Sequence, residues 1–289
     1  MRRNTMDWGR SGTLNRGAPF TLHFFIAGWQ VVEMLGWFSP RIFLGPAQRN
    51  LMKRGVPVFA YHKLAAPPQG TRDPFLYVSP NRFESQLAAL RLAGYSSGQL
   101  DEWPLVHEHE TTKAVITFDD GCANVLEPGL QILSRHHFRA TQFLVAGFLG
   151  QKNQWDVAKG DVPESLMDEV QVRQWLAAGH EIGSHSLYHG NLRHLSQADA
   201  REEIFASKKS LEDRFGIEVR HFAYPYGAWN EAVRDLVGQA GYRSACTMVF
   251  GVNTAGTPRF ELRRVLPLSS TELLRKAMHR LAQKISGAR

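Results

Sequence analysis

The sequence predicts an α/β fold in which parallel strands alternate with helices. From residue 56 onward, short apolar runs recur along the chain, and amphipathic helical patterns separate them. Several of these runs are apolar throughout, as expected for strands that are covered on both faces. Strand and helix alternate six or seven times, which implies a parallel sheet that is either open and doubly wound or closed into a barrel. The predicted strands are 57–61, 114–118, 141–146, 180–184, 221–224, 244–247 and the less regular 262–266.

The helical patterns place apolar residues at three- and four-residue spacing, which is typical of a helix with one buried face. In the longest pattern, Ile204, Leu211 and Phe215 share a face. The last pattern begins with a capping box formed by Ser269 and Glu272. No glycine-rich phosphate loop follows any predicted strand, so a nucleotide-binding fold has no support. The predicted helices are 81–93, 124–136, 164–178, 197–215, 228–240 and 270–285.

Length and composition indicate an ordinary globular protein. The chain has 289 residues, of which 43% are hydrophobic and 21% charged, and this excludes a disordered or collagenous chain. Its only two cysteines, Cys122 and Cys246, exclude a disulfide framework, and neither has a neighbour at zinc-finger spacing. Cys122 follows an acidic pair and is open to two interpretations, a nucleophile or a small buried residue.

The positive charge is concentrated at the two ends of the chain. Residues 1–55 and 259–289 each contain eight Arg or Lys against two acidic residues, a net charge of +6 apiece, which leaves −5 for residues 56–258. A nucleic-acid-binding domain should carry its basic residues along one folded face, so we expect no nucleic acid partner. Basic ends beside apolar segments favour peripheral contact with an anionic membrane surface.

The apolar stretch 20–38 leaves two interpretations open. It follows a basic leader, which suggests a membrane anchor or uncleaved signal, but His23, Gln30 and Glu33 interrupt it. An interfacial helix, or one docked on the main domain, is the alternative, and it favours a cytoplasmic or membrane-peripheral location. We therefore predict three parts: the basic and apolar segment 1–55, the α/β domain over 56–268, and a basic amphipathic helix over 269–289.

Polar residues cluster where the apolar runs end. The carboxyl ends of parallel strands meet at one rim of a barrel, and barrel enzymes assemble their active sites there. Four separate strands delivering such residues to one end is the strongest indication of an enzyme that residue patterns alone provide. The residues are His62, Asp119, Asp120, His185, His189, Pro225, Tyr226 and Gly227.

Two of these groups have the composition of a metal site. The adjacent carboxylates of Asp119 and Asp120 repel each other unless water or a cation offsets their charge, although Asp-Asp-Gly is also ordinary turn chemistry. His185 and His189 are four residues apart and can face one metal, although such pairs also occur as core or surface histidines. Two histidines and one carboxylate would leave coordination positions open for water.

Taken together, the motifs make the chain resemble the polysaccharide deacetylase family, also called the NodB homology family or carbohydrate esterase family 4. TFDDG at 117–121, HSLYH at 185–189 and FAYPYG at 222–227 occur in the family's order, and the likeness covers roughly residues 56–267. The resemblance implies a distorted (β/α)7 barrel with one divalent metal ion, Zn2+ in the first instance, with Co2+ or Ni2+ as alternatives.

The resemblance also implies roles for individual residues. Asp120, His185 and His189 would be the metal ligands, and Asp119 would be the general base. The backbone N–H of Tyr226 would stabilise the oxyanion. Pro225, Tyr226 and Trp155 would contact substrate; for Trp155, which lies in the loop 147–163, plugging that loop against the barrel is an equal alternative.

The chain departs from the family pattern in its acid-bearing motif. The usual late leucine-x-histidine run is missing, and after Gly227 the next histidine is His279. Some relatives are circularly permuted and carry the equivalent strand first, and PVFAYHKL at 57–64 fits this arrangement. His62 is therefore the candidate acid, with a core histidine as the alternative. The family's frequent arginine is Ala223 here, and Arg264 is the candidate to replace it beside Asp119.

The function that we expect is a metal-dependent hydrolase that removes N-acetyl groups from an amino-sugar polymer or glycoconjugate. One alternative is an amidase or esterase that uses the same scaffold on another substrate. A second alternative is a non-catalytic carbohydrate-binding relative at the membrane. The intact set of Asp119, Asp120, His185 and His189 argues against this last possibility.

Overall fold

A parallel β-sheet of seven consecutive neighbours forms the centre of the protein. The computed structural model describes residues 45–102, 112–268, 272 and 275–279, all of which belong to the compact unit 37–289. The strand order is β1-β3-β4-β5-β6-β7-β8, with every neighbouring pair parallel. The strands are β1 (Val58–Tyr61), β3 (Lys113–Phe118), β4 (Ala140–Leu144), β5 (Glu181–Ser184), β6 (His221–Ala223), β7 (Ser244–Phe250) and β8 (Leu262–Arg264).

The two ends of this sheet meet. Val265, directly after β8, donates its N–H to the carbonyl of Val58 at 2.8 Å, and its own carbonyl accepts from the N–H of Ala60 at 3.1 Å. These two bonds join the last strand to the first in parallel. The sheet is therefore a nearly closed barrel, and the open, doubly wound alternative is wrong.

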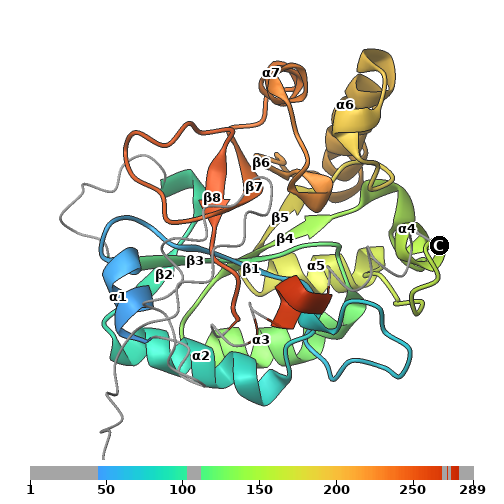
Figure 1. The fold of residues 1–289 in the computed structure, drawn as a ribbon. Helices are drawn as coiled ribbons and strands as arrows, with labels where there is room; N and C mark the ends of the chain where they lie inside the picture. The colour runs from blue at the N-terminus through green and yellow to red at the C-terminus, as the bar shows by residue number, and fades with distance from the viewer. Residues whose placement is uncertain (1–44, 103–111, 269–271, 273–274, 280–289) are drawn as a thin grey trace, which may run out of the picture. The chain divides into compact units, whose positions relative to one another are not determined.

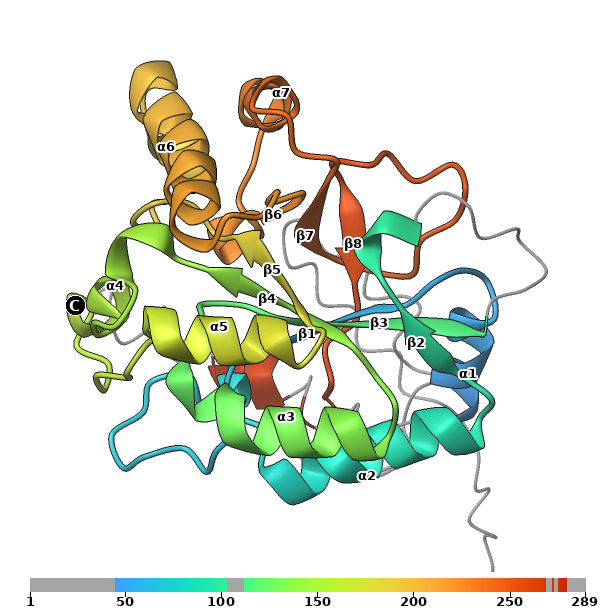
Figure 2. The same ribbon diagram turned by 180° about the vertical axis from the view of Figure 1, so that it is seen from behind.

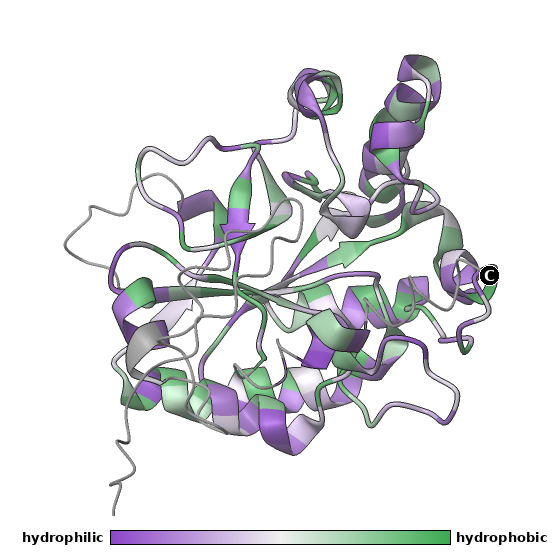
Figure 3. Ribbon diagram, in the orientation of Figure 1, coloured by the Kyte–Doolittle hydropathy of each residue, from purple (hydrophilic) through white to green (hydrophobic). Residues whose placement is uncertain are grey.

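Helices cover the outside of the sheet, as the apolar stripes predict. Figures 1 and 2 show α2, α3 and α5 grouped on one side of the sheet and α6 and α7 on another. Figure 3 shows hydrophobic and hydrophilic residues alternating around these helices, which is the pattern of a helix with one buried face. Their bounds are α2 (Pro80–Leu92), α3 (Leu126–Arg135), α5 (Glu169–Ala177), α6 (Gln197–Phe215) and α7 (Glu231–Gln239).

Side-chain caps explain where several helices begin. Ser79, Ser196 and Asn230 each accept a backbone N–H of the first turn of α2, α6 and α7. Asp168 and Gln171 form a capping box at the start of α5. Helix α5 consequently begins five residues later than the predicted 164, and the residues before it pair with other loops instead.

Several short elements lie outside the predicted set. Strand β2 (Ser96–Gly98) pairs with the first half of β3, and its sequence contains no apolar run that would have revealed it. Helix α1 (Pro46–Met52) lies within the predicted N-terminal segment, and α4 (Gln154–Val157) lies in the loop that contains Trp155. The short 3-10 turn Pro225–Gly227 follows β6.

The core lies between the sheet and its helices. Strands β1 and β4 are buried along their whole length, and β3 is buried except at Lys113. The ring of Phe118 lies edge-on to that of Trp175 on α5, with ring centres 6.0 Å apart. Each such fully buried apolar side chain contributes about 1.5–3 kcal/mol to folding.

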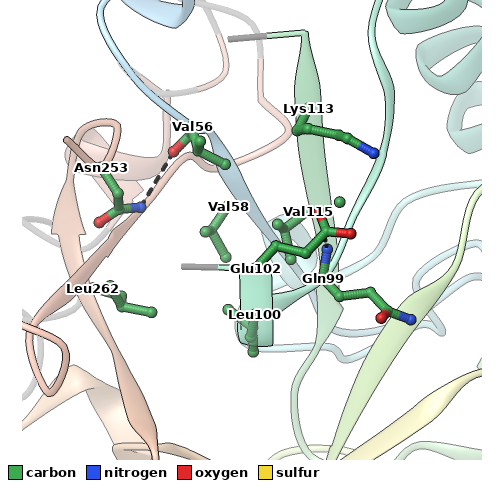
Figure 4. A pocket seen from close by; sticks show the side chains of 10 residues that line it. Val56, Val58, Gln99, Leu100, Glu102, Lys113, Val115, Asn253 and Leu262 are labelled. Atoms are coloured by element: carbon green, nitrogen blue, oxygen red, sulfur yellow. Dashed lines mark hydrogen bonds between the residues drawn. The ribbon is translucent and has the colours of Figure 1, made fainter. Parts of the chain in front are cut away.

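A small pocket lies at the amino ends of β1, β3 and β8 (Figure 4). It is lined mainly by apolar side chains, including Val58, Leu100, Val115 and Leu262. None of the predicted site residues lines it. Since the chemistry-bearing residues follow the carboxyl ends of the strands, this pocket is at the opposite end of the barrel from them.

Among the described residues, no helix combines the length and the hydrophobicity that a transmembrane span requires. The apolar stretch 20–38 lies outside the described residues, as do Ser269 and most of the predicted helix 270–285. The residues of that helix that are described, 272 and 275–279, are helical.

Candidate active site

Chain segments that are remote in sequence converge at the carboxyl ends of the barrel strands. Asp119 and Asp120 follow β3, and His185 follows β5. Arg264 is the last residue of β8, and His62 follows β1 directly. The parallel sheet explains this convergence, because each strand ends at the same rim.

Asp119 forms a buried ion pair with Arg264. The guanidinium donates from Nη1 to Oδ1 at 2.8 Å and from Nη2 to Oδ2 at 2.7 Å, while its Nε donates to the carbonyl of Thr247 at 2.7 Å. Burial, the largest single influence, would raise the pKa of Asp119, but the charge and hydrogen bonds of Arg264 together with the charges of His185 and His62 outweigh burial, so the pKa falls below its ordinary value. The bidentate arrangement holds this carboxylate ionised and in one orientation.

Asp120 lies against the two imidazoles. Its Oδ1 is 3.3 Å from Nε2 of His189 and 3.6 Å from Nε2 of His185. One ligand atom from each of the three residues lies within 4.8 Å of the others, and all three residues are buried. Asp120 and His189 both have a left-handed backbone, with φ of 74° and 60°, which is an uncommon conformation for residues other than glycine and is concentrated at functional sites.

The donor set of this cluster fits a divalent cation. The Nδ1 of His185 is 2.8 Å from the carbonyl oxygen of Ala223, so Nδ1 carries the proton and Nε2 presents its lone pair to the cluster. Burial, the largest cause, lowers the pKa of His185 to about 4, which keeps the ring neutral as coordination requires. Two imidazoles and one carboxylate are a common catalytic zinc donor set, and they leave coordination positions for water.

His62 stands beside the ion pair. Its Nε2 is 3.9 Å from Oδ2 of Asp119, too far for a hydrogen bond. Burial lowers the pKa of His62, against the opposing pull of the Asp120 and Asp119 charges. The side chain of His62 is 15% exposed.

Tyr226 presents both its backbone and its ring at the rim. Its φ is 60°, and the following Gly227 has a φ of 65°; a Cβ at Gly227 would lie 2.5 Å from that of Met248, so this turn requires glycine. Among the described residues, none accepts a hydrogen bond from the N–H of Tyr226. The ring is 46% exposed and lies edge-on to His189, with ring centres 4.6 Å apart.

Trp155 packs directly on a candidate metal ligand. Its ring stacks on His189, with ring centres 4.4 Å apart and planes 21° apart, and only 8% of the residue is exposed. It lies on α4, in the predicted loop between β4 and α5. Packing of this loop against the barrel buries most of the surface of Trp155, and its contact with substrate stays a prediction.

Sequence reasoning missed a polar network behind His62. Lys63 is buried, and its Nζ is 3.4 Å from the hydroxyl of Tyr77, which donates to Oε1 of Glu164 at 2.5 Å. Burial, and then the bond to Glu164, raise the pKa of Tyr77 to about 12. The only sequence signal was that Lys63 follows His62 in PVFAYHKL, and nothing local indicated its partners.

Several other residues of types that can catalyse reactions or bind metals lie away from this site. Burial raises the pKa of the Cys122 thiol far above its ordinary value, which agrees with a small inert residue rather than a nucleophile. His136 faces Glu84, and His279 contacts the Arg72 backbone. The run His107-Glu-His-Glu lies outside the described residues.

Comparison with known proteins finds similarity to polysaccharide deacetylases. A family profile described as polysaccharide deacetylase matches residues 107–245, the segment that contains both carboxylates and both imidazoles. Over this segment the chain is similar to the polysaccharide deacetylase family. Among solved structures, the polysaccharide deacetylase BC0361 from Bacillus cereus has 25% sequence identity and a TM-score of 0.62, covering 77% of this chain and 68% of that one. The Streptococcus pyogenes deacetylase PplD, solved with acetate, has 21% identity and a TM-score of 0.64 over 77% and 97% of the two chains, which supports the fold.

Curated deacetylases match parts of this chain. A chitooligosaccharide deacetylase from Azorhizobium caulinodans is 32% identical over 130 residues, 44% of this chain and 54% of that protein. The peptidoglycan-N-acetylglucosamine deacetylase PgdA of Listeria monocytogenes is 29% identical over 137 residues, 47% of this chain. The matched region spans only 26% of PgdA, whereas the match to YxkH of Bacillus subtilis, at 23% identity, spans 73% of this chain and 70% of that protein.

Proposed function

We propose that this protein is a polysaccharide deacetylase, a metal-dependent hydrolase that removes N-acetyl groups from an amino-sugar polymer or glycoconjugate. The proposal rests on two groups of side chains that lie next to each other at one rim of the barrel. They are the buried cluster of Asp120, His185 and His189, and the ionised carboxylate of Asp119. A metal ligand set next to an oriented, charged base is the arrangement that amide hydrolysis requires.

Asp120, His185 and His189 would hold one divalent ion, with Zn2+ as the first candidate and Co2+ or Ni2+ as alternatives. When bound, this ion would supply Lewis-acid activation of a water and of the acetamide carbonyl. All other steps are assigned to the side chains and backbone of the chain itself.

Asp119 would act as the general base. It takes a proton from the attacking water, whose oxygen forms a bond to the acetyl carbon. Arg264 keeps Asp119 ionised before the reaction and holds its two oxygens in place through the bonds at 2.8 and 2.7 Å. Its role is to position the base.

Tyr226 and His62 would complete the reaction. The backbone N–H of Tyr226 would donate to the oxygen that becomes negatively charged when the carbonyl is attacked. As the carbon–nitrogen bond breaks, His62 would give a proton to the departing sugar nitrogen, so that acetate and a free amine leave. Because β1 lies between β8 and β3, His62 reaches Asp119 from the first strand, and this supports a permuted position for the acid.

The exposed ring of Tyr226 would contact the substrate sugar, whereas Pro225 is buried and would instead hold the turn that presents Tyr226. Trp155, being mostly buried, would offer it only a small surface. The names of the chitooligosaccharide and peptidoglycan-N-acetylglucosamine deacetylases favour an N-acetylglucosamine-containing glycan over another amide or ester. We also propose that the basic ends attach the protein peripherally to an anionic membrane, at a cytoplasmic or membrane-peripheral location. The division of the chain into three parts, with boundaries at residues 55 and 268, is likewise a proposal.

The experiment is acetate release from a panel of N-acetylglucosamine oligomers, with O-acetylated and simple N-acetyl amides as competitors, before and after chelation. We expect acetate from the N-acetylated oligomers, loss of turnover with chelator, and recovery with Zn2+ or Co2+. His189→Ala should lose metal and turnover together. Turnover that persists after complete metal removal would refute metal dependence, and release from the O-acetyl or simple amide substrates alone would favour the esterase or amidase alternative.

A further inference from the structure

The two imidazoles of the proposed metal site are held in different ways. His185 has a hydrogen-bonding partner for the nitrogen that faces away from the cluster, the carbonyl of Ala223 at 2.8 Å. His189 has none: its Nδ1 is buried, and no described residue offers it a hydrogen bond. A metal-binding histidine usually depends on such a partner to fix its ring plane, so His189 must be oriented by something else.

The backbone fixes the position of His189 but not the rotation of its ring. Its N–H donates to Oγ of Ser186 at 3.0 Å, and both residues have a left-handed backbone, with φ of 60° and 66°. These constraints place the Cα–Cβ bond. They leave the side-chain torsion that turns Nε2 toward or away from Asp120 to be set by packing.

Aromatic rings supply that packing. The indole of Trp155 covers one face of the imidazole at 4.4 Å and 21°, close to parallel, while the ring of Tyr226 meets it edge-on at 4.6 Å. The indole cannot move away easily, because the loop behind it is anchored. The preceding Asn153 is buried, accepts the N–H of Glu164 at 2.6 Å and donates to Asp156 at 3.2 Å.

We propose that Trp155 is a positioning residue for the metal site: its indole sets the ring plane of His189 by stacking and takes the place of the missing hydrogen bond. The proposal rests on the metal site proposed above. The loop between β4 and α5 would then contribute to metal affinity, although neither the sequence of this loop nor the identity of the three ligands indicates such a role.

The test is a titration of the purified, metal-free full-length chain with Zn2+ against a competing chelator, and with Co2+ followed by its visible absorption. We expect Trp155→Leu to lose ten- to a hundredfold in Zn2+ affinity, the range found when a supporting partner of a ligand is removed. Its Co2+ spectrum should also change. Trp155→Phe, which keeps a stacking ring, should stay within about threefold of the wild type.

Tyr188→Leu is the matched control. This ring belongs to the same aromatic group, through Phe148, but 53% of the residue is exposed and it has no ring contact with His189. A merely structural role for Trp155 would lower the melting temperature of the metal-free protein and leave the Zn2+ affinity and Co2+ spectrum unchanged, which would overturn the proposal. An equal loss of affinity in Tyr188→Leu would also overturn it.

Two further outcomes are separable. If the wild type binds no divalent ion, the proposed metal site falls, and this inference falls with it; wild-type binding that is unchanged in Trp155→Leu overturns the inference alone. If Trp155→Leu does not fold, 19F spectra of the wild type labelled with fluorotryptophan serve instead. The Trp155 resonance, identified by its absence in Trp155→Phe, should shift when Zn2+ is added, and an unmoved resonance would refute the stacking role.

Discussion

Replacing Arg264 by methionine tests the electrostatic design of the site. The substitution removes the guanidinium and leaves the Asp119 carboxylate buried without its main partner; the side chains are 1% and 3% exposed. Two unit charges about 4 Å apart attract by about 4 kcal/mol at an effective dielectric constant of 20. Removing one member of a buried pair costs about 3–5 kcal/mol, because the other charge stays uncompensated. We therefore expect Arg264→Met to lower the free energy of unfolding by about 3–5 kcal/mol.

The assay is urea unfolding of the metal-free chain at pH 7, followed by circular dichroism, for the wild type, Arg264→Met, Asp119→Asn and the double variant. Each single variant leaves one unpaired buried charge, whereas the double variant leaves none. The double variant should therefore be more stable than Arg264→Met, by about 1 kcal/mol or more. If Arg264→Met loses less than about 1 kcal/mol, or if the double variant is the sum of the two single losses, the argument that Arg264 compensates Asp119 is wrong.

Two other predictions concern histidines. His62→Gln should lower kcat for deacetylation by about a hundredfold or more while leaving the bound metal content unchanged, since a proton donor is lost but no ligand; an unaltered pH–rate profile would move the acid role to another residue. His180 is buried against Trp175, with ring centres 4.3 Å apart, and burial, the largest cause, lowers its pKa to about 4. The unfolded chain therefore binds a proton at this position below about pH 6.5 while the folded chain does not, so stability is lost as the pH falls from 6.5 toward 4. This loss is at most about 3 kcal/mol, at 1.36 kcal/mol for each pKa unit. Chelator-treated His180→Asn should show a shallower fall in unfolding free energy over that range, with measurements at pH 8 as the reference for lost packing; a slope equal to that of the wild type would contradict the assignment.

Local patterns predicted the strands well, for a physical reason. A strand covered on both faces is expected to be mostly apolar. The run 57–61 is apolar throughout, and 114–118 and 141–146 are mostly so, whereas 180–184 and 244–247 contain polar residues. All seven predicted runs overlap an observed strand. The sequence did not predict strand β2 (Ser96–Gly98), because pairing with β3 rather than burial of its own side chains holds this strand in place. The start of α5 was placed too early because the capping box at Asp168 decides it, while Leu166 pairs with Cys122.

The candidate site could be predicted in part. The positions of Asp119, Asp120, His185 and His189 after parallel strands made their meeting at one rim a consequence of the fold class. The suggestion that Arg264 replaces the arginine missing at Ala223 came from resemblance, and the structure brings Arg264 onto Asp119 across 145 residues of sequence. No periodicity could have shown the stacking of Trp155 on His189, or the network joining Lys63 to Tyr77 and Glu164.

The sequence by itself determined which side chains stand at the ends of the strands, because hydrophobic period and strand polarity are local properties of the chain. The tertiary structure decided which of those side chains touch. The join between β8 and β1 closes the barrel and brings Arg264 to Asp119, while the pairing of β1 with β3 places His62 beside it. Such contacts depend on register and closure between strands about two hundred residues apart, as from Val58 to Val265, and no local pattern encodes them.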